Sequence, residues 1–434
     1  MLSLQRFHAL AQKLQYLFLA LLVFRIGSYI PVPGANPAEV ARLLSTGHNL
    51  FGLFNTLSGG AISRLSLFTI GIMPYISTSI IIGLLTKFYP PFERLSKEGE
   101  KGRLMISYYT RLGTLFMAAF QSVNIIKYLS GAGVVIANTT PEFLFIVLSF
   151  ITGTMALMWI GDQITQRGLG QGISLIMVTG IVSGLPSVIG QSIENIRYGL
   201  LSPATFFISL CVLFAALYGV VYFERAQRKI PVYYVRKQQG YGSNALTQQQ
   251  RSDLPLKINM VGVMPCIFAS NIVLAPMAIA QFFQVPQTHW IIQTLQENLS
   301  SGKPLFMILF TIAIMFFSFG YTAVMFNPQD IAENLKKAGG VIQGIRPGAS
   351  TAQYIDLIMS RLTILGAIYI TVVSLLPEML SYFGTIPFSF GGTTLLIVAV
   401  VVMEFFTQVQ AQLFSAQYES VLKRYQPKKS SFVE

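Results

Sequence analysis

Long apolar stretches recur along the chain and are separated by shorter polar segments. Ten of them are long enough to cross a hydrocarbon core about 30 Å thick as α-helices. We place these spans at about 14–33, 66–87, 108–128, 143–161, 171–190, 204–223, 260–282, 304–325, 354–376 and 393–412. The pattern predicts an all-α membrane protein with ten transmembrane helices, of which the second and fifth are interrupted or weakly apolar.

The basic residues predict the orientation of these spans. If the N-terminus lies inside, 24 of the 30 Lys and Arg residues fall on the inner side, as the positive-inside rule requires. Both termini are therefore expected in the cytoplasm. The composition agrees, because only 11% of residues are charged, against about 25% in soluble proteins. The net charge of +13 gathers on one face, where it can meet anionic lipid, RNA or an acidic protein surface.

One short motif occurs twice. Gly71–Ser79 and Gly262–Ser270 both have the pattern G-[IV]-M-P-x-I-x-x-S, in two predicted spans that run in opposite directions. We expect the proline in the middle of each span to kink its helix. An inverted repeat of this kind predicts two halves, residues 1–200 with spans one to five and residues 201–434 with spans six to ten, with a pathway between them. A chance match of so short a motif is the alternative.

The side chains around both motif prolines are apolar, among them Ile72, Ile76 and Ile267. A transporter of small solutes places charged or strongly polar groups at the membrane midplane, and these spans offer almost none. Glu404 is the one acid well inside a span, where it is either functional or a structural acid near the inner surface. Aliphatic and Met side chains suit an adaptable seal around a chain of varying sequence. An inverted-repeat secondary transporter of an organic solute is the alternative.

No motif for catalysis or cofactor binding stands out. The phosphate-binding pattern G-x-x-x-x-G-K-[ST] does not occur, and the three histidines, His8, His48 and His289, have no metal-ligand spacing. The spans hold no pair of residues typical of intramembrane proteolysis. We therefore expect a protein that is not an enzyme and that has no cofactor or metal.

Three segments outside the spans are unusual. The stretch 48–64 is apolar but broken by Gly and Ser, which indicates a re-entrant or movable segment, with a surface amphipathic helix as the alternative. The cytoplasmic loops at about 224–257 and 327–353 are longer than a link between adjacent helices requires. Basic clusters flank Val232–Val235 in the first loop, which suits a projecting hairpin. Both loops suit docking of a large anionic partner, although the positive-inside rule alone also explains basic loops.

Motifs from the first span to the tail closely resemble the SecY family, the channel-forming subunits of the bacterial Sec protein translocase. The matching stretches are Phe24–Ser28, Ser58–Ala61, Gly71–Ser77, Lys97–Glu100, Gly161–Thr165, Gly168–Ser174, Leu254–Asn259, Phe326–Pro328, Gly344–Gly348 and Gln417–Ser420. The resemblance implies two inverted five-helix halves around a central hourglass pore.

The resemblance also implies roles for particular residues. A pore ring corresponds to Ile72, Ile76, Ile173, Met177, Ile267 and Ile397, where Met177 departs from the usual isoleucine. The plug that closes the outer funnel corresponds to about 50–64, with Phe51, Leu53, Phe54, Ser58, Gly59, Gly60 and Arg64. Docking of the SecA motor and the ribosome corresponds to Arg236, Lys237 and Arg346. The second and third spans and the seventh and eighth spans correspond to a lateral gate.

The function implied is a passive pore in the cell inner membrane, driven by SecA or by the ribosome. Unfolded preproteins with signal sequences would cross it, and membrane proteins would leave it sideways into the lipid. The small membrane subunits SecE and SecG are implied as partners. Anionic lipids are expected from the charge.

Overall fold

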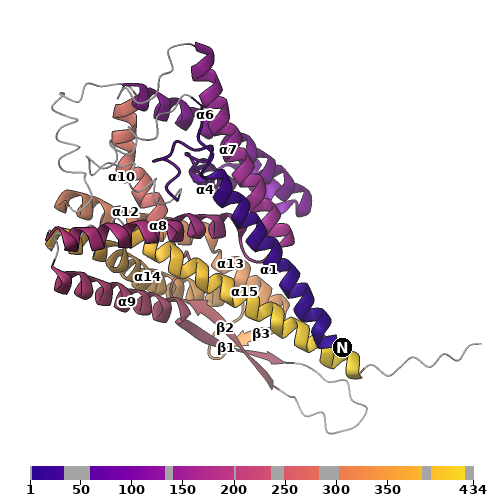
Figure 1. The fold of residues 1–434 in the computed structure, drawn as a ribbon. Helices are drawn as coiled ribbons and strands as arrows, with labels where there is room; N and C mark the ends of the chain where they lie inside the picture. The colour runs from indigo at the N-terminus through magenta and orange to yellow at the C-terminus, as the bar shows by residue number, and fades with distance from the viewer. Residues whose placement is uncertain are drawn as a thin grey trace, which may run out of the picture. The chain divides into compact units, whose positions relative to one another are not determined.

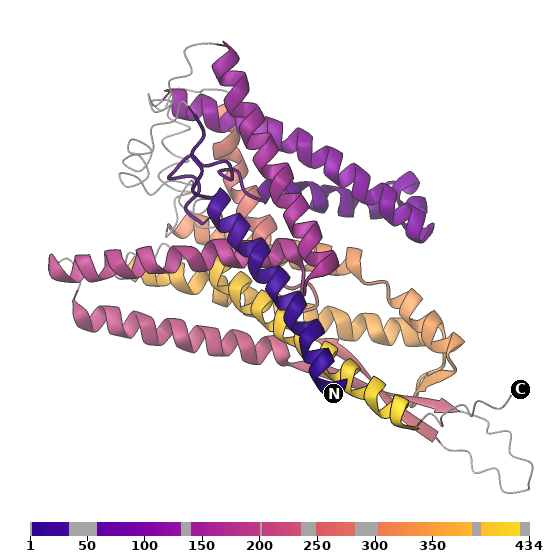
Figure 2. The same cartoon turned by 45° about the vertical axis from the view of Figure 1, so that its right-hand side comes forward.

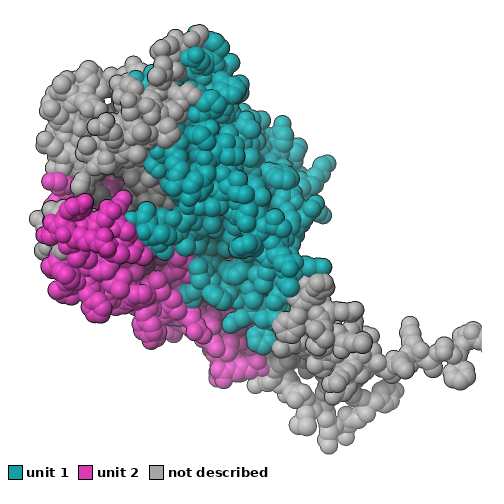
Figure 3. Space-filling model, in the orientation of Figure 1, with its two compact units in different colours: residues 1–187, 401–434 teal, residues 188–400 magenta. Residues whose placement is uncertain are grey.

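The computed structural model of the chain describes residues 2–33, 59–131, 140–199, 202–235, 249–282, 303–383 and 392–425 (Figure 1). The chain forms two compact units, coloured separately in Figure 3. The first unit comprises Met1–Ser187 with Val401–Glu434, and the second comprises Val188–Val400. The unit boundaries fall inside two helices. The division into halves at residue 200 stays a prediction.

The helices and strands follow the predicted order of spans and loops. The first unit holds α1 (Leu2–Gly27), α4 (Met73–Phe88), α5 (Pro90–Lys97), α6 (Glu100–Gly131), α7 (Thr140–Arg167), most of α8 (Gly172–Arg197) and the later part of α15 (Gly392–Tyr425). The second unit holds α9 (Pro203–Arg225), β1 (Gln227–Val235), β2 (Gln249–Lys257), α10 (Met264–Phe282), α12 (Pro304–Met325), α13 (Pro328–Lys337), β3 (Gly340–Ile342) and α14 (Ala349–Phe383).

Each of the ten predicted spans overlaps a helix of the described residues. Among the described residues, seven helices have the length and composition to cross a membrane, and α4 and the start of α10 are shorter apolar helices. The predicted helical membrane fold is confirmed. The second and seventh spans differ in one respect, because their helices begin only at Met73 and Met264.

The prediction that Pro74 and Pro265 kink the middle of a helix is wrong. Pro74 lies in the first turn of α4, and Pro265 is the second residue of α10. First-turn N–H groups have no partner inside the helix, so proline there removes no hydrogen bond and its fixed φ favours the helix. Each copy of the motif therefore ends an irregular stretch and starts a helix.

The irregular stretch 59–72 is held inside the first unit. Its backbone bonds to the residues after α1, through Val32 N to Leu65 O (2.9 Å) and Leu67 N to Ile30 O (2.9 Å). Leu65 and Ile70 pack with buried residues of α6 and α7 in one apolar cluster. Gly153 of α7 contacts the carbonyl of Leu67 so closely that a Cβ would not fit. Protein packing thus surrounds this non-helical backbone, which is what a bilayer requires of irregular backbone in its interior.

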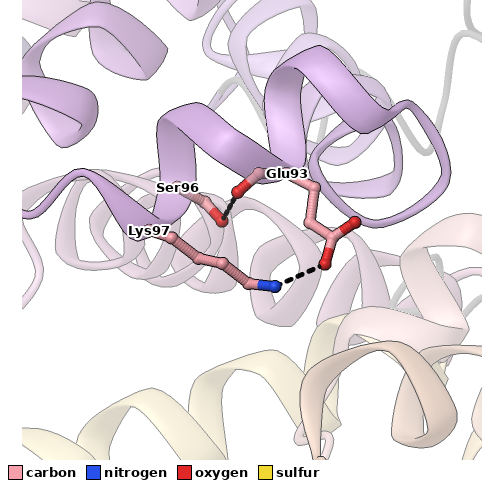
Figure 4. Close-up of polar contacts among 3 residues, drawn as sticks. All are labelled: Glu93, Ser96 and Lys97. Carbon is pink, nitrogen blue, oxygen red and sulfur yellow. Dashed lines mark hydrogen bonds and ion pairs between the residues drawn. The ribbon is translucent and has the colours of Figure 1, made fainter.

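The short helix α5 closes the connection between α4 and α6. Lys97 and Glu93 form an i,i+4 ion pair of 2.7 Å, and Ser96 Oγ donates to the Glu93 carbonyl at 2.8 Å (Figure 4). The hydrogen bond from Lys97 lowers the pKa of the Glu93 carboxyl. Phe92 packs on Tyr109 of α6 with ring centroids 5.3 Å apart. These contacts fix the end of α4 against the start of α6.

Two chain segments far apart in sequence meet along α1. Lys13 Nζ of α1 donates to Gln412 Oε1 of α15 at 3.5 Å. Figures 1 and 2 show α1 beside the later part of α15, close to the label that marks the N-terminus. This contact lies entirely within the first unit and joins its two sequence segments.

The second unit contains a small sheet with strand order β2-β1-β3. β1 and β2 pair antiparallel from Gln227↔Lys257 to Val235↔Gln249, which confirms the hairpin predicted in the first cytoplasmic loop. β3, from the second loop, pairs with β1 through Val232↔Ile342. The buried face packs on the start of α14, where Ile355 is fully buried. The two loops that were predicted to be cytoplasmic therefore contribute strands to one sheet.

Candidate pore and docking surface

A small apolar pocket, about 20 Å³ in volume, lies within the first unit where α4 begins. Its wall contains three of the predicted ring residues, Ile72, Ile76 and Met177. The remaining lining residues are also apolar; they are Phe24, Phe68, Ile70, Gly71, Met73, Leu157 and Ile176. A wall without a charge or a hydrogen-bonding side chain gives a polar solute nothing to bind.

The start of α4 sets the positions of the first two ring residues. Ile72 directly precedes the helix, and Ile76 lies one turn further on, with Ile76 N donating to Ile72 O at 3.1 Å. Both side chains are buried. The turn at Gly71 and the proline at Pro74 therefore decide where these two isoleucines stand.

α8 carries the next two ring residues one turn apart. Met177 lines the pocket, whereas Ile173 is absent from its wall. A Cβ on Gly161 of α7 would lie 2.8 Å from Ile173 Cγ1, so Ile173 packs closely against that helix. Sequence reasoning missed Phe24, Phe68, Leu157 and Ile176, because apolar side chains on neighbouring helices are too common to single out.

In the second unit, Ser374 of α14 contacts both α10 and α15, the helices that carry the predicted ring residues Ile267 and Ile397. Cys266 Sγ, next to Ile267 on α10, lies 3.1 Å from Ser374 Oγ in a buried hydrogen bond. Gly392, at the start of α15, contacts the Ser374 carbonyl so closely that a Cβ would not fit. Ile397 follows on α15, and both Ile267 and Ile397 are buried. α14 therefore fixes the helices that carry these two ring residues.

The start of α10 is held by Asn259. Its Oδ1 accepts from Gly262 N at 3.0 Å, and its Nδ2 donates to Gly262 O at 3.3 Å. Nδ2 also donates to Glu224 Oε1 at 2.5 Å, at the end of α9. Asn259 is 5% exposed, so these hydrogen bonds are sheltered from water and its side chain fixes the turn that precedes Met264.

The plug residues fall partly within the described chain. Phe51, Leu53, Phe54 and Ser58 lie outside the described residues, whereas Gly59, Gly60 and Arg64 lie within them. Gly59 and Gly60 have φ of 69° and 80°, a left-handed conformation that glycine adopts without strain. The guanidinium carbon of Arg64 lies 4.1 Å from the ring centroid of Tyr29, a cation–π contact.

Of the predicted docking residues, the structure describes only Arg346, in the turn that follows β3. Arg346 is exposed, and its carbonyl accepts a hydrogen bond from Thr351 Oγ1 at 3.0 Å. Ile345 beside it packs on the sheet's apolar cluster. Arg236 and Lys237 directly follow β1 but lie outside the described residues. Exposed basic side chains of the sheet itself are Arg228, Lys229, Arg251 and Lys257.

None of the residues that line the pocket is charged. Arg111 of α6 and Asp162 of α7 form a 2.8 Å ion pair that links these helices. Glu404 is exposed on α15. Within the described ranges, no three His, Cys, Asp or Glu side chains gather in a metal-binding arrangement.

The helical architecture is that of a polytopic membrane protein, and its apolar pocket offers a polar solute no charged side chain. Comparison with known proteins then identifies the family: the SecY family model matches residues 66–406, and the chain belongs to the SecY family. Its family members are protein-translocation channel subunits rather than enzymes, and the comparisons give no support to a solute transporter.

The relatives match along almost their whole length. The protein translocase subunit SecY of Pseudomonas aeruginosa is 47% identical over 413 residues, which cover 95% of this chain and 93% of the relative. The Escherichia coli K12 protein of the same name is 48% identical over 421 residues, covering 96% and 94%. This chain is therefore similar to these SecY subunits over most of their length.

Solved structures share the fold at lower sequence identity. A structure described as that of a protein conducting channel has a TM-score of 0.67 at 17% identity, covering 94% of this chain and 93% of the other. Sec61 in the canine ribosome-channel complex from the endoplasmic reticulum has a TM-score of 0.64 at 16% identity, with the same coverage. At this identity the similarity supports the fold alone.

Proposed function

We propose that the chain forms a passive pore through which unfolded preproteins cross the cell inner membrane and from which membrane proteins move sideways into lipid. The main support for this proposal is the apolar wall of the pocket, which contains Ile72, Ile76 and Met177. Aliphatic and thioether side chains fit irregular shapes without demanding a defined polar group. Such a wall suits a translocating chain whose side chains change at every step.

In this proposal six residues contact the translocating chain. Four come from the first unit, at the start of α4 and on α8, and two come from α10 and α15 of the second unit. They are Ile72, Ile76, Ile173, Met177, Ile267 and Ile397. The pairs α4–α6 and α10–α12 act as the two sides of the lateral gate. Close packing within each pair supports this, because Gly113 of α6 faces Thr78 of α4, and Phe268 of α10 stacks on Phe317 of α12.

The proposed energy source lies in partners that dock on the cytoplasmic sheet. SecA and the ribosome use Arg236, Lys237 and Arg346 as cationic contacts. The fold around Arg346 supports this role, because Ile345 and Thr351 anchor the turn while the guanidinium stays exposed. A solved relative in the fold comparison is Sec61 in a ribosome-channel complex, as its description states.

The remaining partners and the location complete the proposal. SecE and SecG are the small membrane subunits, and anionic lipids meet the basic inner face. The distribution of Lys and Arg supports an orientation with both termini in the cytoplasm.

The test is preprotein uptake into proteoliposomes that contain the chain and its copurifying subunits, with SecA and ATP added. A preprotein with a signal sequence should become protected from protease, and the same preprotein without the signal should stay accessible. Equal protection of both would contradict a gated pore. Failure of protection in vesicles that accumulate an organic solute would instead favour the transporter.

A further inference from the structure

We propose that Arg25 is a positioning residue that clamps the segment Gly59–Arg64 to α1 and α8 and so holds the resting channel shut. This inference rests on the proposed function, in which that segment belongs to the plug. Arg25 lies in the last turn of α1. A charge at this place in an apolar span is costly unless it has partners, and such residues are commonly functional.

The guanidinium of Arg25 joins three parts of the first unit. Its Nη1 donates to the Gly59 carbonyl at 3.1 Å and lies 3.0 Å from Ser183 Oγ on α8. Its Nη2 donates to the Tyr29 hydroxyl at 3.0 Å. Hydrogen bonds from a charged donor are roughly twice as strong as neutral ones. One side chain therefore ties the segment both to its own helix and to a helix about 160 residues away.

Ser183 is built as an acceptor for this arginine. Its hydroxyl donates to the Gly180 carbonyl at 2.7 Å, within α8. Because the hydroxyl proton is used there, the oxygen is left to accept from Arg25 Nη1. The arrangement orients Ser183 before the segment docks.

Gly59 is the residue that allows the segment to come this close. A Cβ at this position would lie 2.9 Å from Ser183 Oγ and 3.0 Å from Gly180 Cα. Its φ of 69° is a second reason, since other residues adopt that conformation only with strain. The Gly59 carbonyl thus reaches Arg25 only because glycine occupies this position.

A second cation fixes the other end of the segment. Arg64 lies over the ring of Tyr29 at 4.1 Å, and the guanidinium carbon of Arg25 lies 4.8 Å from the same ring centroid. The stretch that follows is held by its own backbone, since Ala61 O accepts from Ser66 N at 3.0 Å and from Thr69 Oγ1 at 3.2 Å. The Gly59 end is therefore the part whose attachment depends on Arg25.

The test measures resting ion conductance of the complete channel complex in planar bilayers. Arg25→Gln should raise the open fraction about tenfold, which corresponds to about 1.4 kcal/mol. Ser183→Ala should raise it by less, because Tyr29 and Gly59 still accept from Arg25. Arg25→Lys keeps the charge but offers one ammonium in place of the planar fork, so its conductance should lie between wild type and Arg25→Gln.

Ser187→Ala is the matched control. Ser187 lies one turn further along α8, makes the same local bond to a backbone carbonyl, Gly184 O at 2.7 Å, and is exposed. It should leave the conductance unchanged. A rise for Ser187→Ala equal to that for Ser183→Ala would overturn the clamp, as would wild-type conductance in Arg25→Gln complexes that assemble normally.

Deleting residues 53–62 separates the clamp from the plug on which it rests. If the deletion raises the conductance and Arg25→Gln does not, the clamp is wrong and the plug survives. If the deletion itself leaves the conductance unchanged, the plug assignment fails, and the clamp fails with it. The proposal is supported if the deletion and Arg25→Gln each raise the conductance and Arg25→Gln has no further effect in the deletion variant. Arg25 then acts through the plug.

Discussion

Gly71 and Gly262, 191 residues apart, adopt the same left-handed backbone conformation, with φ of 64° and 66°. Each precedes by two residues the methionine at which a helix begins, Met73 for α4 and Met264 for α10. The repeated motif therefore specifies a repeated local structure: a turn, a first-turn proline and an isoleucine one turn into the helix. That structure fixes where Ile76 and Ile267 stand.

Replacing Gly262 with alanine should destabilise the protein by about 1–2 kcal/mol, because the Cβ of an L-residue crowds its own backbone at positive φ. Nothing lies within 4 Å of the added Cβ, so the effect is conformational and not steric. Thermal unfolding of the detergent-solubilised complex measures it. Gly320→Ala is the control, since Gly320 also has open space at its Cβ but lies inside α12 with ordinary helical backbone. That variant should be neutral or stabilising.

Asn259→Ala should destabilise the start of α10 by about 1–3 kcal/mol, because it leaves the Gly262 N–H without its acceptor. Asn259→Asp should be worse, since a second carboxylate would face Glu224 where the amide now donates. Adding Glu224→Gln to Asn259→Asp should then restore part of the loss. Unfolding midpoints of wild type, Asn259→Asp, Glu224→Gln and the double variant provide the check, and additive effects of the two changes would rule out the coupling.

Arg346→Glu should reduce SecA-driven export severalfold and impair translation-coupled membrane insertion less. The reason is that the guanidinium is exposed while the turn is anchored by Ile345 and Thr351, so the change alters charge and not the fold. Arg346→Lys should retain much of the export. Parallel assays of both routes decide the matter: equal loss in both, together with reduced accumulation of the protein, would point to a fold defect.

Ile76→Asn should increase the resting ion conductance, because an amide in the apolar wall holds water where an isoleucine excludes it. Ile76→Leu keeps the volume and the apolar character and should leave the seal intact. Single-channel recordings compare the two. A conductance that responds equally to both substitutions would show that polarity at this position does not govern the seal.

The Glu93–Lys97 pair should make a small contribution to stability that depends on pH. In the folded protein the pKa of the Glu93 carboxyl lies below its unfolded value of about 4.5. The stabilisation by the ion pair is therefore fully present above pH 4.5 and is lost as the pH falls through the lowered pKa of the folded state. Lys97→Met should therefore differ from wild type at neutral pH and converge with it in acid. Both side chains are largely exposed, so the difference should be small and should shrink further in high salt.

Hydropathy was sufficient to locate the spans, because a bilayer demands about 20 apolar residues per crossing helix. It did not reveal that residues 66–72, placed in the second span, are irregular, since Leu65, Ile70 and Gly153 bury that stretch through tertiary packing. Pro74 and Pro265 were predicted to lie in the middle of a helix for the same reason, because an apolar stretch does not show at which residue the helix begins.

The pairing of β1 with β3 was also beyond the sequence. Val232 and Ile342 are 110 residues apart, and neither loop alone indicates that the other supplies a strand. Ring residues followed from the resemblance, whereas Phe24 and Leu157 became visible only in the pocket. The sequence does not indicate the contact between Arg25 and Gly59. Arg25 donates to the backbone carbonyl of Gly59, and every residue has such a carbonyl.

The most direct measurement of the central claim is site-specific photocrosslinking from Ile76 and Ile267 to a stalled preprotein, with and without its signal sequence. A pore predicts crosslinks from both positions to the chain that carries the signal, and none without it. If neither position crosslinks in membranes shown to be export-competent, these residues do not line the path of the translocating chain and the proposed pore is contradicted.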